Sequence, residues 1–335
     1  ANLQKLGVEK LDYVISNHAE QDHSGAISKV LGLYPEAKVV TNQRCKDMLM
    51  DLLLIPEAEF ITVEEGDTVS LGDKTLEFIL APWVHWPETM LTYLREDKIL
   101  FPCDLFGSHL ATSELYAVDE AKVYESAKRY YAEIMMPFRT LIKQHLEKLK
   151  DFEIEVIAPS HGPLYHRPEF ILEAYRDWVS DDVKNEVVIA YVSMHGSTRR
   201  MVDHLVKALI ERGIVVKPFN LTVADIGELA TALVDTATIV IASPAVLAGP
   251  HPSAVYTTYL ANALRPKVKF ASVIGSYGWG GRVVEQIKGM LTSLKVEVLD
   301  PVVARGYPEE GDLKALDGLA EEILNKHKGL GITGG

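Results

Sequence analysis

The sequence predicts two α/β domains in tandem, the second of them a doubly wound parallel sheet. Three observations predict this arrangement. Histidines and carboxylates gather between Asn17 and Gly25, a loop rich in serine and glycine precedes a helix at 193–198, and the rhythm of strands and helices changes near residue 180. The regular alternation of strands and helices after that change is typical of a parallel sheet covered by helices on both faces.

Length and composition agree with two domains. A chain of 335 residues is longer than one hydrophobic core usually supports, and 47% of its residues are hydrophobic, which suffices to bury two cores. The polar stretch 180–185 separates a helix that ends near Trp178 from the first strand of the second half. We therefore expect a first domain at residues 1–180 and a second at 185–329.

The first domain has an irregular rhythm. Short strands are expected at 38–41, 59–63, 68–71 and 75–80, and a long helix or a pair of helices is expected over 119–150. Tyr130 and Tyr131 lie in an apolar part of that helical span, so we expect both side chains in the core, with the alternative that one hydroxyl reaches the metal site described below.

The run from Asn17 to Gly25 is the densest cluster of metal-binding side chains. His18, Glu20, Asp22 and His23 stand within six residues. The stretch before the run is apolar and β-prone, and the stretch after it has the apolar spacing of a helix, so we expect the run on a strand-to-helix turn. This density predicts a site for two metal ions. Because adjacent ligands require a tight backbone, His23 is the member that can turn away.

Three single residues further along occupy the same kind of position. His85, Asp104 and His161 each follow a stretch of strand-like residues. Strand ends that meet at one edge of a sandwich would bring all seven side chains, four imidazoles and three carboxylates, to one point. Simpler roles remain open for two of them, since His85 can pack with its tryptophan neighbours and Asp104 can cap a turn.

These ligand types favour iron. Two divalent cations bring four positive charges, which three carboxylates and one hydroxide would cancel. Sites with carboxylates beside imidazoles suit iron, whereas open sites rich in histidine suit zinc hydrolysis. The order of the residues resembles the metallo-β-lactamase fold with its HxHxDH motif, but Glu20 replaces the second histidine. In the form HxExDH, the motif resembles that of flavodiiron proteins, also called A-type flavoproteins.

A second motif of a different kind follows residue 185. A β-branched strand expected at 186–193 leads through the sequence Ser-Met-His-Gly-Ser-Thr into an amphipathic helix at 199–212. Backbone N–H groups and hydroxyls at a helix N-terminus can cradle a phosphate, as in a flavodoxin-like phosphate loop. The loops 243–250 and 275–281 also follow strands and are suited to a flavin ring.

Three such loops at the C-terminal edge of a parallel sheet predict an FMN site, and no GxGxxG fingerprint of a dinucleotide is present. The residues expected to bind FMN are Ser193, Met194, His195, Gly196, Ser197, Thr198, Ser243, Pro244, Ala245, Val246, Leu247, Ala248, Gly249, Ser276, Tyr277, Gly278, Trp279 and Gly280. Other roles stay open: the first loop can be a plain helix cap, Trp279 can cover a partner surface, and His195 can remain solvated.

The two motifs together identify the chain as a member of the flavodiiron protein family over nearly its whole length. The resemblance implies a metallo-β-lactamase-like αββα sandwich followed by a flavodoxin-like doubly wound sheet. It implies an oxidoreductase that reduces dioxygen to water or nitric oxide to nitrous oxide at a non-haem diiron centre fed by FMN. The iron ligands it implies are His18, Glu20 and His85 for one ion, Asp22, His23 and His161 for the other, and Asp104 as the bridge.

The resemblance also implies partners. Family members form a head-to-tail homodimer or a tetramer, in which the flavin of one chain faces the diiron site of another, and take electrons from rubredoxin, a flavin reductase or a reduced deazaflavin coenzyme. They have several strands before HxExDH, whereas His18 stands close to the start of this sequence. We therefore expect the first strands of the sandwich to be supplied by another chain, cleaved, or left out of this sequence.

Composition excludes several classes of function. The net charge of −13 argues against nucleic acid and anionic membrane surfaces as partners. No apolar run approaches the roughly 20 residues of a membrane span, and no signal peptide opens the sequence. Cys45 and Cys103 provide neither a disulfide framework nor a rubredoxin-type CxxC pair, so we expect a cytoplasmic protein.

Two other functions stay open. A zinc-dependent hydrolase of the metallo-β-lactamase fold, fused to a flavodoxin module, would cleave a thioester or a lactam, and Glu20 is the feature against it. An inactive electron-transfer or scaffold module would need no metal ligands, and the intact set argues against that reading. The sequence does not choose between dioxygen and nitric oxide.

Overall fold

The computed structural model describes residues 2–292 and 294–333. The chain divides into two compact units. The N-terminal unit comprises Ala1–Tyr131 and Phe138–Val179, and the C-terminal unit comprises Ala132–Pro137 and Ser180–Gly335. The change after Val179 lies beside the polar stretch at which the sequence predicts a boundary.

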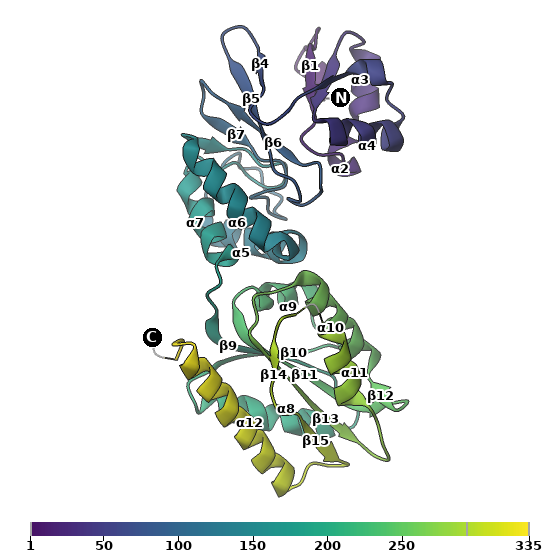
Figure 1. Cartoon of the computed structure of the whole chain (residues 1–335), viewed down its shortest axis with the longest axis vertical. Coiled ribbons are helices and arrows are strands. Elements are labelled where there is room, and N and C mark those ends of the chain that lie inside the picture. Colours follow the sequence, from purple (N-terminus) through teal and green to yellow (C-terminus); the bar gives the residue numbers. More distant parts are fainter. Residues whose placement is uncertain (1, 293, 334–335) are drawn as a thin grey trace. The chain divides into compact units, whose positions relative to one another are not determined.

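The N-terminal unit has two sheets with helices on their outer sides (Figure 1). One sheet is parallel, in the order β1-β2-β3, and the other has the order β4-β5-β6-β7-β8, antiparallel except for the parallel pair β7–β8. The strands are β1 (Tyr13–Ile15), β2 (Lys38–Thr41), β3 (Phe60–Thr62), β4 (Thr68–Ser70), β5 (Thr75–Leu80), β6 (Met90–Leu94), β7 (Ile99–Phe101) and β8 (Val156–Ile157). The helices are α1 (Asn2–Lys5), α2 (Gln21–Ser24), α3 (Ile27–Leu33), α4 (Gln43–Leu53), α5 (Glu120–Tyr130), α6 (Arg139–Lys148) and α7 (Pro168–Val179).

Apolar side chains from both sheets close the sandwich. Val40 of β2, Phe78 of β5 and Met90 of β6 are fully buried in one cluster. On the other side of the first sheet, Val39 of β2 packs in a second cluster with Leu49 of α4. Successive residues of a strand face opposite sides, so Val39 and Val40 serve the two clusters in turn. This arrangement confirms the predicted metallo-β-lactamase-like αββα sandwich.

Three details differ from the sequence expectation or refine it. Helix α2 begins at Gln21, so Asp22 and His23 lie on a helical turn and not on an open loop. Strand β6 has no counterpart among the expected strands, because its first four residues are all buried and lack the alternation of a half-buried strand. The span 119–150 holds a pair of helices, α5 and α6, with the π-helical turn Tyr131–Met135 between them.

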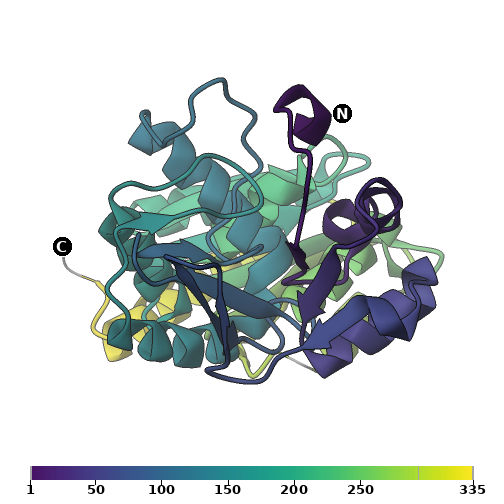
Figure 2. The same ribbon diagram turned by 90° about the horizontal axis from the view of Figure 1, so that it is seen from above.

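Helix α1 stands off from the rest of the N-terminal unit (Figure 2). None of its residues is buried. The segment that follows is held by a hydrogen bond from the Tyr34 hydroxyl to the backbone oxygen of Val8, at 2.9 Å. Helix α1 therefore adds little to the core of this unit.

The C-terminal unit is a parallel sheet with helices on both faces. Its order is β10-β9-β11-β13-β14, β15 also pairs with β13, and β12 folds back on the end of β11. The strands are β9 (Lys184–Tyr191), β10 (Val215–Asn220), β11 (Thr236–Val246), β12 (Gly249–Pro250), β13 (Phe270–Tyr277), β14 (Glu297–Val298) and β15 (Val302–Arg305). The helices are α8 (Ser197–Ile210), α9 (Ile226–Leu233), α10 (Pro252–Leu264), α11 (Val283–Met290) and α12 (Glu310–Gly329). This order confirms the predicted flavodoxin-like doubly wound sheet.

Two apolar clusters fix the helices of the C-terminal unit. Leu205 of α8 and Ile323 of α12 pack with Ile189 of β9, whereas Ile287 of α11 packs with Val188 of the same strand. Figure 1 shows α8 and α12 on one face of the sheet and α9, α10 and α11 on the other. Among the described residues of the whole chain, no helix is both long and apolar enough to cross a membrane.

The buried imidazole of His327 ties α12 to the sheet. Its Nδ1 lies 2.8 Å from Oδ1 of Asn185 in β9, and its Nε2 lies 2.8 Å from the Thr238 hydroxyl in β11. Burial lowers the pKa of His327 to about 4. Between this value and about 6.5, the ordinary pKa of histidine, the unfolded chain binds more protons at this group than the folded chain.

The contribution of His327 to stability should therefore be complete above about pH 6.5 and fall by up to about 3 kcal/mol as the pH falls to about 4. The variant His327→Gln removes this titration, so its free energy of unfolding in urea should lose less than the parent's between pH 7 and pH 5. The matched control is His204→Gln. His204 lies on α8 and forms a more exposed ion pair with Asp317, which is on α12 like His327. An equal acid loss in the parent and the His327 variant would contradict the prediction.

Candidate metal centre and cofactor cavity

The structure brings all seven metal-binding side chains of the N-terminal unit together. His18 and Glu20 lie on the loop after β1, and Asp22 and His23 lie on α2. The other three come from separate loops: His85 lies between β5 and β6, Asp104 follows β7, and His161 follows β8. The side chains form two groups that share Asp104.

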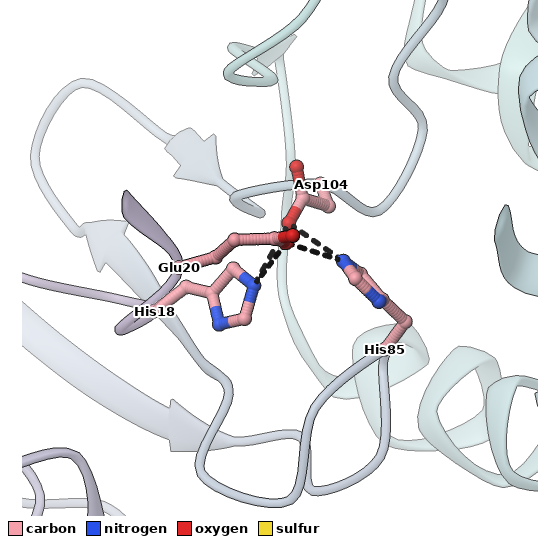
Figure 3. Close-up of side chains that lie close together, drawn as sticks. All are labelled: His18, Glu20, His85 and Asp104. Carbon is pink, nitrogen blue, oxygen red and sulfur yellow. Dashed lines mark hydrogen bonds and ion pairs between the residues drawn. The ribbon is translucent and has the colours of Figure 1, made fainter. Parts of the chain in front are cut away.

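The first group contains His18, Glu20, His85 and Asp104 (Figure 3). Nε2 of His18 and Nε2 of His85 each lie 3.2 Å from Oε2 of Glu20. The same two nitrogens each lie 3.5 Å from Oδ2 of Asp104. Two imidazoles and two carboxylates therefore aim one atom each at a common point.

The second group contains Asp22, His23 and His161, with Asp104 beside them. Nε2 of His23 lies 3.4 Å and Nε2 of His161 lies 3.3 Å from Oδ2 of Asp22. Both nitrogens lie 3.1 Å from Oδ1 of Asp104. Asp104 thus turns one carboxylate oxygen to each group.

The spacing of these atoms fits metal ions. A metal with imidazole and carboxylate ligands at about 2.1 Å holds neighbouring ligand atoms roughly 3.0 to 3.4 Å apart, in octahedral or tetrahedral geometry. The distances within both groups are close to this range. In addition, Nε2 of His23 is buried and has no hydrogen-bond partner of acceptable geometry among the described residues. A nitrogen aimed into the group without a proton acceptor is what a metal ligand requires.

The electrostatics of the groups also favour a cation. Burial alone would raise the pKa of Asp104, but the imidazoles of His161, His23 and His85 beside it hold it well below its ordinary value. Burial lowers the pKa of His23, but Asp104 and the neighbouring carboxylates raise it, and the net effect is a rise. The pKa of His161 is raised by its hydrogen bond to Asp104. The carboxylates thus draw positive charge to these rings, and a metal ion can take the place of the protons.

One side of the paired groups is open. The side chains of His18 and Asp104 are 0% and 1% exposed, whereas those of His161, Glu20 and Asp22 are 34%, 38% and 51% exposed. A small molecule can therefore approach between the exposed members while the inner members stay dry.

Two polar residues beside the groups were not predicted as site residues. The hydroxyl of Tyr130, expected in the core with the metal pocket as the alternative, is buried and donates a hydrogen bond to Oδ1 of Asp104 at 3.1 Å. Burial and the Asp104 charge raise the pKa of Tyr130, which keeps this proton on the hydroxyl. Glu88, three residues after His85, accepts from Nδ1 of His18 at 2.7 Å. A tyrosine in a helix and a glutamate after a proline carry no local pattern that marks such roles.

The backbone conformation of the loop that carries His161 requires a glycine at position 162. Gly162 has φ of +87°, and a Cβ there would overlap the hydroxyl of Ser108, whose backbone N–H donates to the His161 oxygen at 3.0 Å. A residue without a side chain is needed both for this backbone conformation and for this close approach. The position of His161 therefore depends on its small neighbour.

The C-terminal unit has a cavity of about 330 Å³ at the C-terminal ends of β9, β11 and β13. This is the point of a doubly wound sheet at which the strand order reverses, where ligands bind. Eleven of the residues predicted to bind FMN line it: Ser193, Met194, His195, Ser197, Thr198, Pro244, Ala245, Val246, Ser276, Tyr277 and Gly278. Gly306, after β15, also lines the cavity, and no motif around it in the sequence indicates this position.

The first loop of the cavity has the features of a phosphate cradle. Gly196, at the N-cap of α8, has φ of +89° and provides no side-chain cap, so it leaves the N–H groups of the first turn to other acceptors, such as a phosphate. The Thr198 hydroxyl lies 3.0 Å from that of Ser276, which joins the first loop to the third. Ser193 Oγ accepts from the backbone N–H of Arg199 at 3.1 Å.

Several residues predicted to bind FMN do not line this cavity. Ser243 Oγ instead accepts from the N–H of His251 and donates to the Pro244 oxygen. Leu247 and Trp279 are 96% and 82% exposed. The other predicted residues outside the lining are Gly196, Ala248, Gly249 and Gly280. Gly196 lies between two lining residues, Ala248 lies on the turn between β11 and β12, Gly249 begins β12, and Gly280 lies two residues after the lining residue Gly278.

Comparisons with known proteins agree with both halves of this description. A family model described as "ODP family beta lactamase" matches residues 2–162. A protein named nitric oxide reductase from Moorella thermoacetica is 37% identical over 297 residues, 87% of this chain and 74% of that protein. A coenzyme F420H(2) oxidase from Methanothermobacter marburgensis is 33% identical over 306 residues, 88% of this chain and 76% of that protein.

Solved structures extend the similarity to the whole fold. Rubredoxin oxygen:oxidoreductase from Desulfovibrio gigas has a TM-score of 0.92 and 25% identity, over 95% of this chain and 81% of that chain. The flavodiiron protein from Giardia intestinalis has a TM-score of 0.88 and 28% identity, over 94% of this chain and 79% of that chain. The similarity therefore extends over nearly the whole of this chain.

Proposed function

The chain belongs to the flavodiiron protein family of oxidoreductases, and from this premise we propose that it reduces dioxygen to water, nitric oxide to nitrous oxide, or both. Its cofactors are a pair of iron ions and FMN. We assign the iron pair to the N-terminal unit, as its diiron domain, and FMN to the cavity of the C-terminal unit.

The proposed ligands follow the two groups of side chains. His18, Glu20 and His85 would bind one iron, and Asp22, His23 and His161 the other. The single observation that carries this assignment is the orientation of Asp104, whose Oδ2 faces the first group at 3.5 Å and whose Oδ1 faces the second at 3.1 Å. A carboxylate with one oxygen for each ion is the bridge that a two-metal site needs.

When bound, the iron pair supplies the gas-binding and electron-accepting centre, and FMN passes it electrons from a donor. Reducing one dioxygen to two waters takes four electrons and four protons, and coupling two nitric oxide molecules to nitrous oxide and water takes two of each. The residues of this chain hold the ions, keep the inner ligands dry and leave an open side. Tyr130 keeps a proton against Oδ1 of Asp104 and so fixes that carboxylate.

We propose that electrons come from outside the chain, from rubredoxin, a flavin reductase or a reduced deazaflavin coenzyme. The names of the relatives support this, because one is an oxidase of coenzyme F420H(2) and another an oxidoreductase of rubredoxin. Cys45 and Cys103 are both buried and free, which fits the cytoplasmic location that we propose and that cell fractionation would test.

We further propose a head-to-tail homodimer or a tetramer, in which the flavin of one chain serves the iron pair of another. Met194, Leu247 and Trp279 around the cavity are 54%, 96% and 82% exposed, and a partner surface would cover them. Sedimentation should give a dimer or larger species. A monomer with full gas reduction at high dilution would exclude the proposal.

The function is tested by stopped-flow oxidation of the anaerobic, reduced protein. Mixing with dioxygen or nitric oxide should reoxidise the flavin and the iron pair, with water or nitrous oxide as product. Elemental analysis should give about two metal ions per chain, mostly iron. Stoichiometric zinc, cleavage of a thioester or lactam, and no reduction of either gas after iron loading would instead establish the hydrolase.

The bridge is tested by Asp104→Asn. An amide lacks the charge and the second anionic oxygen needed between two cations, so iron should fall to at most about one ion per chain. Gas reduction should fall by more than the roughly 10- to 100-fold typical of a lost partner outside the ligand set. Asp97→Asn, in an exposed ion pair with Lys74, is the control. Both irons and full turnover in the Asp104 variant would show that Asp104 is only structural.

The phosphate cradle is tested by replacing Ser197 and Thr198 together with alanine. Two hydroxyls that donate to a charged phosphate are lost, so FMN affinity should fall by roughly 100-fold, measured by fluorescence during dilution. Thr231→Ala on α9, whose hydroxyl donates to the Gly227 oxygen of its own helix, should bind FMN like the parent. Unchanged flavin occupancy in the double variant would place the phosphate elsewhere.

A further inference from the structure

A buried carboxylate outside the two ligand groups, Glu88, contacts the far side of one metal ligand, His18. Oε1 of Glu88 accepts a hydrogen bond from Nδ1 of His18 at 2.7 Å and another from the backbone N–H of Ala19 at 3.0 Å. The side chains of Glu88 and His18 are both 0% exposed. This single oxygen therefore fixes both the ring of His18 and the backbone that leads to Glu20.

Glu88 is itself held in place from two sides. It lies three residues after His85, on the loop between β5 and β6, and its backbone oxygen accepts from Nδ2 of Asn42 at 2.6 Å. Oδ1 of the same asparagine caps α4 by accepting from the N–H of Cys45 at 3.0 Å. The carboxylate thus joins two loops that carry ligands of the first group, and its backbone is anchored to a helix end.

The hydrogen bond to Nδ1 decides which nitrogen of His18 is left for a metal. Because Nδ1 donates its proton to Glu88, the lone pair of the neutral ring is on Nε2, which lies 3.2 Å from Oε2 of Glu20. A carboxylate partner on the far nitrogen fixes the orientation of a ligating ring and makes it a stronger donor. At His18, Glu88 is such a carboxylate partner on Nδ1.

The charge of Glu88 needs a positive partner nearby. A buried carboxylate is costly unless it is paired, and its Oε2 is buried with no hydrogen-bond partner among the described residues. A metal ion on Nε2 of His18 would give the ring the positive charge that this carboxylate lacks. With the three ligand carboxylates, Glu88 also brings the nearby negative charge to four, equal to the charge of two ferrous ions.

We propose that Glu88 is a positioning residue that orients His18 toward the first iron and tunes the reduction potential of the iron pair. The proposal rests on the proposed function and deepens it. Removing the negative charge while keeping an acceptor oxygen, as in Glu88→Gln, makes the ferric state less favourable. The midpoint potential of the iron pair then rises, and iron is held less tightly.

The test uses the full chain loaded with iron and FMN under anaerobic conditions. Iron affinity is measured by competition with a ferrous chelator, and the midpoint potential by redox titration followed by electron paramagnetic resonance. Glu88→Gln should weaken iron binding by about 10- to 100-fold and raise the midpoint potential. Glu64→Gln, an exposed carboxylate on the same surface hollow as Glu88, is the matched control and should leave both unchanged.

A Glu88→Gln protein that matches the Glu64 variant in affinity and potential overturns the proposal, even if its melting temperature is lower, since that pattern describes packing alone. Should Glu88→Gln not fold, Glu88→Asp keeps the charge but shortens the reach to Nδ1 of His18. The Glu88→Asp variant should then bind iron more weakly at a nearly unchanged midpoint potential. Iron binding as tight as that of the parent protein would overturn the proposal. A parent protein that binds no iron pair overturns the proposed function as well. A parent that binds iron and reduces gas, with a Glu88→Gln variant of the same iron affinity and potential, overturns this inference alone.

Discussion

The N-terminal unit depends on one buried carboxylate. Asp104 lies between four imidazoles and the Tyr130 hydroxyl, and each of its oxygens faces one group of side chains. Gathering like charges is unfavourable unless cations separate them. The loops after four different strands must therefore be fixed by the sandwich itself. The apolar clusters around Val39, Val40 and Phe78 provide that rigid frame.

The sequence predicted best what is local and dense. Four of the seven metal-binding residues stand within six positions, and the strand at 38–41 and the strand at 75–80 have the bounds that the structure gives to β2 and β5. The single residues after strands were visible because strand ends meet at one edge. The features that the patterns did not indicate, or indicated for Tyr130 only as an alternative, are buried on all sides. Strand β6 has no alternation, and Glu88 and Tyr130 act through contacts with residues at least 26 positions away.

The flavin cavity shows a different limit. Its first loop was recognisable because a glycine and hydroxyl residues precede a helix, and those features are local. Phosphate recognition itself relies on backbone N–H groups, which every residue but proline has, so the sequence names the loop and not the individual contacts. Gly306 reaches the cavity through the pairing of β15 with β13, a long-range feature that no spacing reveals.

Backbone strain marks the loops around the metal groups. Trp83, Cys103 and Phe106 have φ of +67°, +55° and +70°, values that cost residues with side chains about 1 to 3 kcal/mol each. Cys103 directly precedes Asp104, and Trp83 lies two residues before His85. The frame thus holds side chains where the isolated loops would not place them. Metal binding would offset part of this cost, because ions that bind only the folded arrangement stabilise it by mass action. Stability and function in this unit are therefore linked through the same ligands, and a substitution that relaxes a loop can strengthen the fold while it weakens the metal site.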